Sequence, residues 1–226
     1  MRNIFFMPLR QGSKGIPEKN HKTLLGKPLF SWVLEGVINS NAASEIWVAT
    51  DCKTVKNILI NEYPSVKIFN RKSENAQDDS PTIDVVLEFL SVMPFNKKDY
   101  FILFQATSPF TSTNDFLKLI HKMESGKSDS YIACARLKRF RWSDDGVSLD
   151  YQLNKKPRRQ DYKGFLVETG AFYASKVGAI ISNKKLISGK IEIVELSSEA
   201  LIDIDEPIDW YLGEAALRYL QSNGTY

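Results

Sequence analysis

The chain has 226 residues, a length that fits one α/β domain with a small appended arm better than two independent domains. Hydrophobic residues make up 43% of it and charged residues 25%, which excludes an intrinsically disordered chain and a disulfide-stapled miniprotein. The 30 Lys and Arg residues nearly balance the 27 Asp and Glu residues, at a formal net charge of +3. This balance argues against a nucleic-acid partner, so any preference for anions must be local.

The spacing of cysteines and histidines and the sequence of the N-terminus argue against a zinc protein and a membrane or secreted protein. Cys52 and Cys134 do not form a Cys-x-x-Cys pair, and the two histidines are not spaced with them as zinc ligands would be. The apolar run at residues 4–7 is far shorter than the core of a signal sequence or a membrane span. We expect a cytoplasmic protein with reduced thiols, no structural zinc and no membrane partner.

Strand-like and helix-like patterns alternate along the chain, as in α/β proteins with a mainly parallel sheet flanked by helices. Apolar runs predict strands at residues 4–7, 46–49, 66–69, 100–104, 131–135, 171–174 and 191–194. The run at 100–104 is apolar throughout, as expected of a central strand. Helical spacing predicts helices near 29–37, after Asp51, after Ser80, after Ser112 and from Pro207 onward. Ser80 is the expected N-cap of the third helix, with Pro81 in its first turn, and Ser112 or Thr113 that of the fourth.

The alternation breaks between Arg136 and Lys163, where the chain is polar and basic with aromatic residues interspersed. Ordinary connections are short, so a stretch of this length is functional, an interaction element or flexible. No internal repeat or linker divides the chain. We therefore expect a single domain over residues 1–226 with an arm at residues 136–166.

The loop after the first predicted strand combines glycines with three cations. The glycines let the main chain approach an anion, and Arg10, Lys14 and Lys19 can neutralise triphosphate charge. The loop lacks both the Gly-Lys-Ser/Thr ending of a Walker A loop and the G-x-G-x-x-G of dinucleotide folds. It indicates a phosphate site of another kind, and a solvated surface loop is the alternative.

A second pattern is Asp203-Ile204-Asp205, after an apolar approach and just before the predicted Pro207 helix. Alternate residues of an extended segment face the same way, so both carboxylates can meet one hard cation. Mg²⁺ prefers one or two carboxylates with phosphate oxygens and water, which suits a nucleotidyl-transfer site. The alternative, favoured for an isolated Asp-x-Asp, is that these acids cap the final helix.

Two further polar clusters adjoin predicted strands and helices. Gln105, Thr107 and Ser108 follow the central strand, at the usual ligand crevice of an open α/β sheet. Residues 78–82, Asp-Asp-Ser-Pro-Thr, put acids and hydroxyls before a helix. Taken alone, the first cluster is better explained by a turn and the second by helix capping.

Taken together, these segments resemble the CMP-N-acylneuraminate (CMP-sialic acid) synthetases, the cytidylyltransferases that activate nine-carbon sugar acids, over nearly the full chain. The most specific match is the family's R-x-x-S-K-x-x-P-x-K-N signature, carried here by Arg10, Ser13, Lys14, Pro17, Lys19 and Asn20. Other matches follow in family order: Thr50-Asp51, Gln105 with Thr107-Ser108-Pro109, Pro157-Arg158, Gly170-Ala171 before Tyr173, and Ile202-Asp203-Ile204-Asp205.

The resemblance implies a mononucleotide-binding, Rossmann-like fold, CTP as cosubstrate, and a homodimer whose arm reaches the partner's site. It also implies that Asp203 and Asp205 hold Mg²⁺ and act in catalysis with Arg10 and Lys14. The residues implied to hold CTP are Arg10, Gly12, Ser13, Lys14, Asn20, Asp79 and Ser80. Those implied to face the sugar acid are Gln105, Thr107, Ser108, Arg158, Thr169 and Tyr173. No general base is identified.

The sequence departs from the family pattern where the acceptor would be recognised. The family's Gln-Pro-Thr-Ser-Pro-Leu-Arg is Gln-Ala-Thr-Ser-Pro-Phe-Thr at residues 105–111, and its common Asn-Gly is Thr169-Gly170, preceded by Glu168. Legionaminic, pseudaminic, KDN and Kdo acids are therefore alternative substrates. Kdo synthetases carry Ser-Thr-Arg where this chain has Ser-Lys-Gly at residues 13–15, which argues against Kdo. A sugar-1-phosphate nucleotidyltransferase or a non-catalytic nucleotide-binding homologue are further alternatives.

Overall fold

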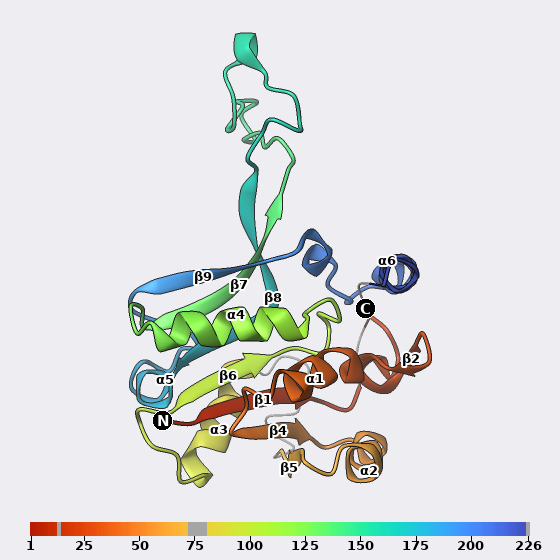
Figure 1. The fold of residues 1–226 in the computed structure, drawn as a ribbon, viewed down its shortest axis with the longest axis vertical. Coiled ribbons are helices and arrows are strands. Elements are labelled where there is room, and N and C mark those ends of the chain that lie inside the picture. Colours follow the sequence, from red (N-terminus) through yellow and green to blue (C-terminus); the bar gives the residue numbers. More distant parts are fainter. Residues whose placement is uncertain (13–14, 72–80, 225–226) are drawn as a thin grey trace.

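The computed structural model describes residues 1–12, 15–71 and 81–224 (Figure 1). In these residues seven strands form one sheet, in the order β5-β4-β1-β6-β8-β7-β9. Their bounds are Asn3–Leu9 (β1), Glu45–Thr50 (β4), Lys67–Phe69 (β5), Tyr100–Phe104 (β6), Ser130–Leu137 (β7), Phe165–Lys176 (β8) and Ile191–Leu196 (β9). All neighbours pair in parallel except β8, which runs antiparallel to both β6 and β7. The predicted mainly parallel α/β sheet is confirmed.

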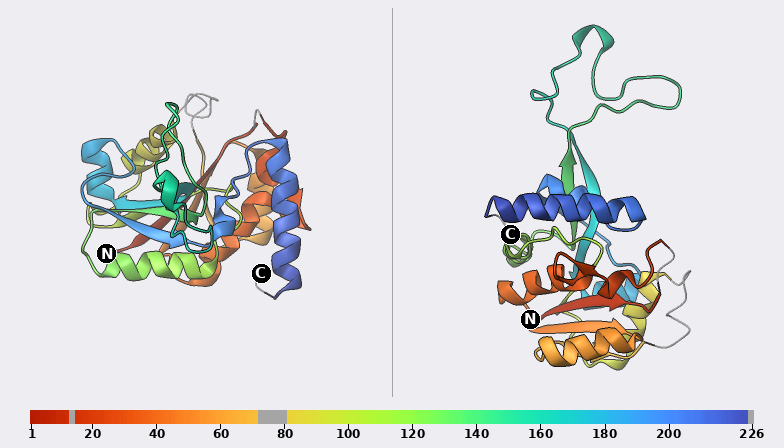
Figure 2. Two further views of the ribbon diagram at one scale, coloured as in Figure 1. Left: turned by 90° about the horizontal axis from the view of Figure 1, so that it is seen from above. Right: turned by 90° about the vertical axis from the view of Figure 1, so that its right-hand side faces the viewer.

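Helices cover both faces of this sheet (Figures 1 and 2). One face carries α1 (Leu29–Ser40), α2 (Lys53–Glu62) and α4 (Thr113–Glu124), and the other carries α3 (Thr82–Val92) and α5 (Val177–Asn183). The last helix, α6 (Pro207–Ser222), lies outside this layer against α1. Shorter elements are the hairpin β2 (Thr23–Leu24) and β3 (Lys27–Pro28) and the single turns η1 (Lys19–His21), η3 (Leu153–Lys155) and η4 (Ser198–Leu201).

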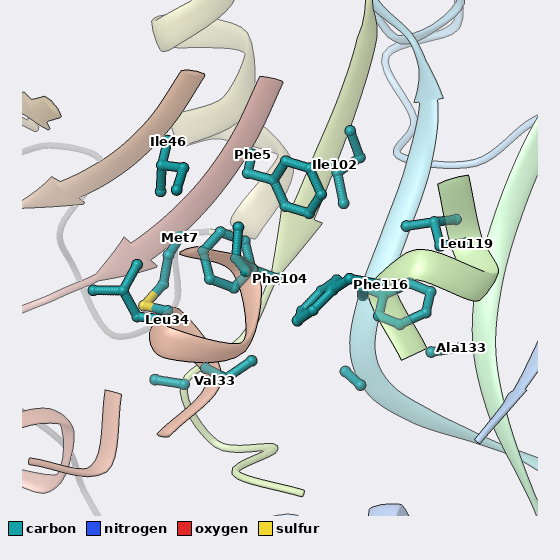
Figure 3. Packing of buried hydrophobic residues seen from close by; sticks show 14 of the residues in the cluster. Phe5, Met7, Val33, Leu34, Ile46, Ile102, Phe104, Phe116, Leu119 and Ala133 are labelled. Carbon is teal, nitrogen blue, oxygen red and sulfur yellow. The ribbon is translucent and has the colours of Figure 1, made fainter. Parts of the chain in front are cut away.

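Strand β6 is buried over its whole length, which explains its unbroken apolar sequence. Ile102 and Phe104 face the larger core cluster, where Phe104 and Phe5 meet the ring of Phe116 from α4 (Figure 3). Phe101 and Leu103 face the opposite cluster under α3 and α5. The carboxyl ends of β1 and β6 are thus held firmly side by side.

A third apolar cluster fixes the segment that precedes α6. Ile204 is fully buried between Trp210 and Leu217 of α6 and Trp32 of α1. Gly213 allows this approach, because a Cβ there would lie 2.8 Å from the Ile204 side chain. The residues on either side of Ile204 are therefore held at a set distance from the sheet.

Helix boundaries differ from the sequence prediction in one place. Helix α3 begins at Thr82, one residue later than expected, with Pro81 in an extended conformation (φ −57°, ψ 141°) at the cap position. Pro81 is therefore not in the first turn, and the prediction that Ser80 is the N-cap is wrong. Ser112 does cap α4, as predicted, and its hydroxyl and the Asp115 carboxylate form a capping box.

The predicted arm projects away from the sheet (Figures 1 and 2). Residues 138–164 connect the ends of β7 and β8, so Arg136 and Leu137 belong to the sheet rather than to the arm. Within the arm, Arg141 forms an ion pair of 2.8 Å with Asp150, and the ring of Phe140 packs on those of Tyr151 and Tyr162. A dimerisation role for the arm stays a prediction.

Candidate active site

A cavity of about 310 Å³ opens beyond the carboxyl ends of β1 and β6. Its walls come from the first loop, the chain after β5, the start of α3, the turn after β6 and the segment before α6. The lining residues are Pro8, Arg10, Gly12, Lys19, Asn20, Arg71, Thr82, Val85, Gln105, Ala106, Thr107, Asp203 and Asp205. Segments almost 200 residues apart in the sequence therefore meet at one polar site, in the crevice where ligands bind in open α/β sheets.

The first loop is shaped by hydrogen bonds between side chains and the main chain and by two residues in the left-handed region. Gly12 has φ +84°, a conformation that favours glycine, and Glu18 also lies in the left-handed region at φ 54°. The side-chain amide of Asn20 donates to the Arg10 carbonyl at 3.1 Å, and the main-chain amide of Gln11 donates to Asp51 Oδ1 at 2.7 Å. Asp51 thus connects the first loop to the end of β4 and supports the conformation of the loop.

In the segment 203–205 the two acids line the cavity, while Ile204 between them is fully buried in the core. The Ile204 amide donates to the Thr107 carbonyl at 2.8 Å, which joins this segment to the turn after β6. Gly15 of the first loop packs directly on the Asp205 carbonyl, where a Cβ would collide. Lys19 Nζ lies 2.5 Å from Asp205 Oδ1.

These acids do not cap the final helix. The capping box of α6 is formed by Glu206 and Asp209, whose carboxylates accept hydrogen bonds from the first turn and from the cap amide. The capping alternative for Asp203 and Asp205 is therefore wrong, and both carboxylates are available to the cavity.

Burial changes the acidity of one of the pair. Partial burial raises the pKa of Asp203 to about 6, and the neighbouring Asp205 carboxylate adds to this rise. Hydrogen bonding to Thr107 and the charge of Lys19 oppose it. Asp203 Oδ1 is buried and has no hydrogen-bond partner in the described part of the chain. A buried carboxylate oxygen without a partner is costly, unless a bound cation completes its coordination.

The two carboxylates fit a magnesium ion but not a metal held by protein alone. Within residues 1–12, 15–71 and 81–224, no three His, Cys, Asp or Glu side chains converge as metal ligands. Mg²⁺ is usually bound by one or two carboxylates, with phosphate oxygens and water completing the octahedron. Asp203 and Asp205, beside a cavity lined with cations, provide this donor set.

Two cations of the cavity were not among the predicted site residues. Lys19 is only 8% exposed and reaches the cavity with its ammonium group. The sequence placed it among the loop's cations and in the family signature but gave it no role at the site. Arg71 follows β5. Its pKa lies below the usual value, because burial and the nearby charge of Arg10 lower it by more than the charges of Asp51 and Glu88 raise it. Its position after a parallel strand was the signal that could have revealed it.

The residues expected to face the sugar acid divide into two groups. Gln105 and Thr107 line the cavity. Ser108 and Thr169 are buried, and their hydroxyls donate to the carbonyls of Thr169 and Ala133. These two side chains support the wall of the site and are not exposed to a ligand in this structure.

Tyr173 and Arg158 lie outside the lining of the cavity. The Tyr173 hydroxyl donates to Glu168, and burial together with the charges of Glu168 and Asp203 raises the pKa of Tyr173. Tyr173 therefore lies close enough to Asp203 to respond to its charge. Arg158 is on the arm, 79% exposed, and pairs with Asp161 at 3.0 Å. The remaining predicted residues, Ser13, Lys14, Asp79 and Ser80, lie outside the described residues.

Comparison with known proteins decides the family. A family model described as "Cytidylyltransferase" matches residues 4–199. The chain belongs to the cytidylyltransferase family. N-acylneuraminate cytidylyltransferase A of Danio rerio is 34% identical to it in an alignment of 212 residues that covers 91% of this chain and 48% of that protein. The CMP-N,N'-diacetyllegionaminic acid synthase of Legionella pneumophila is 33% identical over 98% of both chains. The predicted resemblance to CMP-sialic acid synthetases is confirmed.

This cytidylyltransferase family member spans about half the length of the vertebrate relatives that it matches. Among solved structures, a CMP:2-keto-3-deoxy-manno-octonic acid synthetase complexed with CTP superposes with a TM-score of 0.71 at 17% identity, over 97% of this chain and 99% of that one. At this identity the likeness shows the fold alone. No helix in the described residues is long and apolar enough to cross a membrane.

Proposed function

We propose that this protein transfers CMP from CTP to the anomeric hydroxyl of a nine-carbon 2-keto sugar acid of the N-acylneuraminate type and releases pyrophosphate. The observation that carries the proposal is the cavity whose lining combines the cations Arg10, Lys19 and Arg71 with the carboxylates Asp203 and Asp205. Three cations match the charge of a triphosphate, and two carboxylates match the divalent ion that accompanies it.

In the proposed reaction the anomeric oxygen attacks the α-phosphorus of CTP in line. The bond from the α-phosphorus to the bridging oxygen breaks, the proton of the attacking hydroxyl passes to solvent, and pyrophosphate leaves toward the cations of the first loop. Such transfers depend mainly on alignment and on neutralising charge that develops in the transition state. When bound at Asp203 and Asp205, Mg²⁺ supplies part of that neutralisation.

The chain's own residues bind and orient the reactants. Arg10 and Lys19 hold the leaving pyrophosphate, together with Lys14 by analogy with the family signature. Asn20 acts indirectly, because its amide fixes the carbonyl of Arg10 at 3.1 Å. Gln105 and Thr107 also line the cavity and are the proposed contacts of the sugar acid.

The acceptor is the least constrained part of the proposal. Legionaminic acid is the second candidate, because the relative named a CMP-N,N'-diacetyllegionaminic acid synthase is coextensive with this chain. A pseudaminic acid cytidylyltransferase of Campylobacter jejuni matches at 24% identity over 91% of both chains. KDN and Kdo are more distant alternatives. Thr169 stands where the family commonly has Asn, and Glu168, which precedes it, accepts a hydrogen bond from the Tyr173 hydroxyl.

We further propose that the protein is a cytoplasmic homodimer whose arm reaches the partner's site. Arg158 lies on a projecting arm and outside the lining of its own chain's cavity, as an arginine acting on a partner's substrate would. The two cysteines, Cys52 and Cys134, are unpaired, in keeping with a reducing compartment.

Pyrophosphate release tests the proposal directly. The protein is assayed with each nucleoside triphosphate, alone and with N-acetylneuraminate, diacetyllegionaminate, pseudaminate or Kdo, in the presence of Mg²⁺. Release that requires both CTP and a nine-carbon acid supports it. Loss of release in Asp205→Asn but not in Glu214→Gln, a half-buried acid of α6 that pairs with Arg218 outside the cavity lining, locates the site. Release with UTP or with a sugar phosphate would refute it. CTP binding without turnover would favour a regulator.

A further inference from the structure

We propose that Lys19 is a positioning residue whose ammonium group takes the place of the divalent cation at Asp205 until a nucleotide binds. Without nucleotide, the ammonium group of Lys19 neutralises the Asp205 carboxylate, and the site has little affinity for free metal ions. The inference rests on the proposed function, because it concerns the same pair of aspartates.

The Lys19–Asp205 ion pair is built from a buried lysine and an accessible carboxylate. The Lys19 side chain is 10% exposed and that of Asp205 61%, with Nζ and Oδ1 2.5 Å apart. Lysine is almost never this buried unless it is paired. The aliphatic stem is therefore fixed within the protein, while the ammonium group emerges where a ligand of Asp205 would sit.

The main chain holds both partners in place. The Lys19 amide donates to the Ile16 carbonyl at 3.2 Å, at the start of the single turn η1. Gly15 packs on the Asp205 carbonyl, and the Asp205 amide donates to Asp209 Oδ2 at 3.2 Å. The ion pair is consequently a fixed feature of the site, and separating it requires a competing charge.

A triphosphate supplies that competing charge. A metal ion alone must displace a fixed ammonium group from Asp205, and it then leaves that ammonium group in a cavity that already holds Arg10 and Arg71. With CTP present, Lys19 can exchange the carboxylate for phosphate oxygens and release Asp205 for the metal. Asp203 Oδ1, buried and without a hydrogen-bond partner in the described residues, is then the second ligand. Metal and nucleotide should therefore bind together.

The test measures Mn²⁺ binding to the full chain without nucleotide, by electron paramagnetic resonance of the free ion. In Lys19→Met the competing charge is gone, so Mn²⁺ should bind about tenfold tighter or more, the size expected for losing a unit charge in contact with the ligand. Lys19→Arg keeps the charge and should resemble the wild type. Lys22→Met is the matched control, because Lys22 is exposed and lies over the Trp210 ring, 4.4 Å from its centroid.

A second titration, with CTP, distinguishes the possible roles of Lys19. The same Lys19→Met variant should bind CTP about tenfold more weakly or worse, because the phosphate contact is lost. Opposite changes in the two affinities support the exchange. Weaker CTP binding with unchanged Mn²⁺ binding would mean that Lys19 contacts only phosphate, and loss of both would mean a purely structural role. Either result overturns the inference.

Failure of the inference and failure of the proposed function can be told apart. If the wild type turns over with CTP and a sugar acid while Lys19→Met leaves Mn²⁺ binding unchanged, only the exchange is refuted. If no sugar acid supports turnover but Mn²⁺ binding still tightens, the proposed reaction fails and the exchange remains.

Discussion

Replacing Gly15 by alanine should damage the reaction far more than the fold. A Cβ on Gly15 would collide with the Asp205 carbonyl oxygen and lie 3.4 Å from its carbon. Because Ile204 anchors residues 203–205 against α6, the first loop must yield by on the order of 1 Å, and misplacement of this size lowers turnover about 100-fold. That loss corresponds to ~2.7 kcal/mol of transition-state stabilisation. Strain of this kind typically reduces the free energy of unfolding by about 1 to 3 kcal/mol.

Steady-state pyrophosphate release and thermal unfolding separate the two effects. Gly126→Ala is the control: Gly126 has φ +63° in the turn after α4 and open space around it, so its substitution should cost about 1 kcal/mol of stability and no activity. A folded Gly15→Ala variant with kcat/KM within about threefold of the wild type, where 100-fold is expected, would refute the reasoning. It would mean that contact between the first loop and Asp205 does not set the geometry of the site.

Three further predictions concern individual side chains. Arg71→Gln should weaken CTP binding about tenfold or more, through loss of a charged hydrogen-bond donor, whereas exposed Arg218→Gln should not; calorimetry measures both. Without metal, ionised Asp203 lowers the stability of the fold as pH rises through about 6, because the pKa of Asp203 in the folded protein exceeds its usual 3.8. The Asp203→Asn variant should therefore melt at a higher temperature than the wild type at pH 8 and at nearly the same temperature at pH 4. A difference in melting temperature that is the same at both pH values would contradict the assignment. Glu168→Gln, which alters the partner of Tyr173, should change KM for the sugar acid but not for CTP, while Glu195→Gln changes neither; an unchanged acceptor KM would remove Glu168 from recognition.

The sequence predicted those strands and helices whose apolar pattern matches the way they are buried in the fold. The continuous apolar run at residues 100–104 predicted a central strand covered on both faces, and the structure places it in the middle of the sheet. The reversed direction of β8 was not predictable, because the residues of a strand do not encode which way it runs. The start of α3 was misplaced because a proline fits both the first turn of a helix and the extended cap position that Pro81 adopts.

Those parts of the site were predictable in which the spacing of residues determines which side chains face the same way. The alternation of Asp203 and Asp205 around a buried Ile204 follows from the sequence alone. The burial of Ser108 and Thr169 does not, because a hydroxyl near a strand end can serve the main chain as well as a ligand. Arg71 was missed because it follows a strand of only three residues, β5, whose end gave no motif.

The central claim is that the first loop and the two aspartates close around one triphosphate and its divalent ion. A crystal structure with CTP and Mn²⁺, located by its anomalous signal, tests this directly. The account predicts a Mn²⁺ peak bonded to carboxylate oxygens of Asp203 and Asp205 and to phosphate oxygens, with the triphosphate beside Arg10. An ion bound elsewhere, or a triphosphate remote from the first loop, would contradict it.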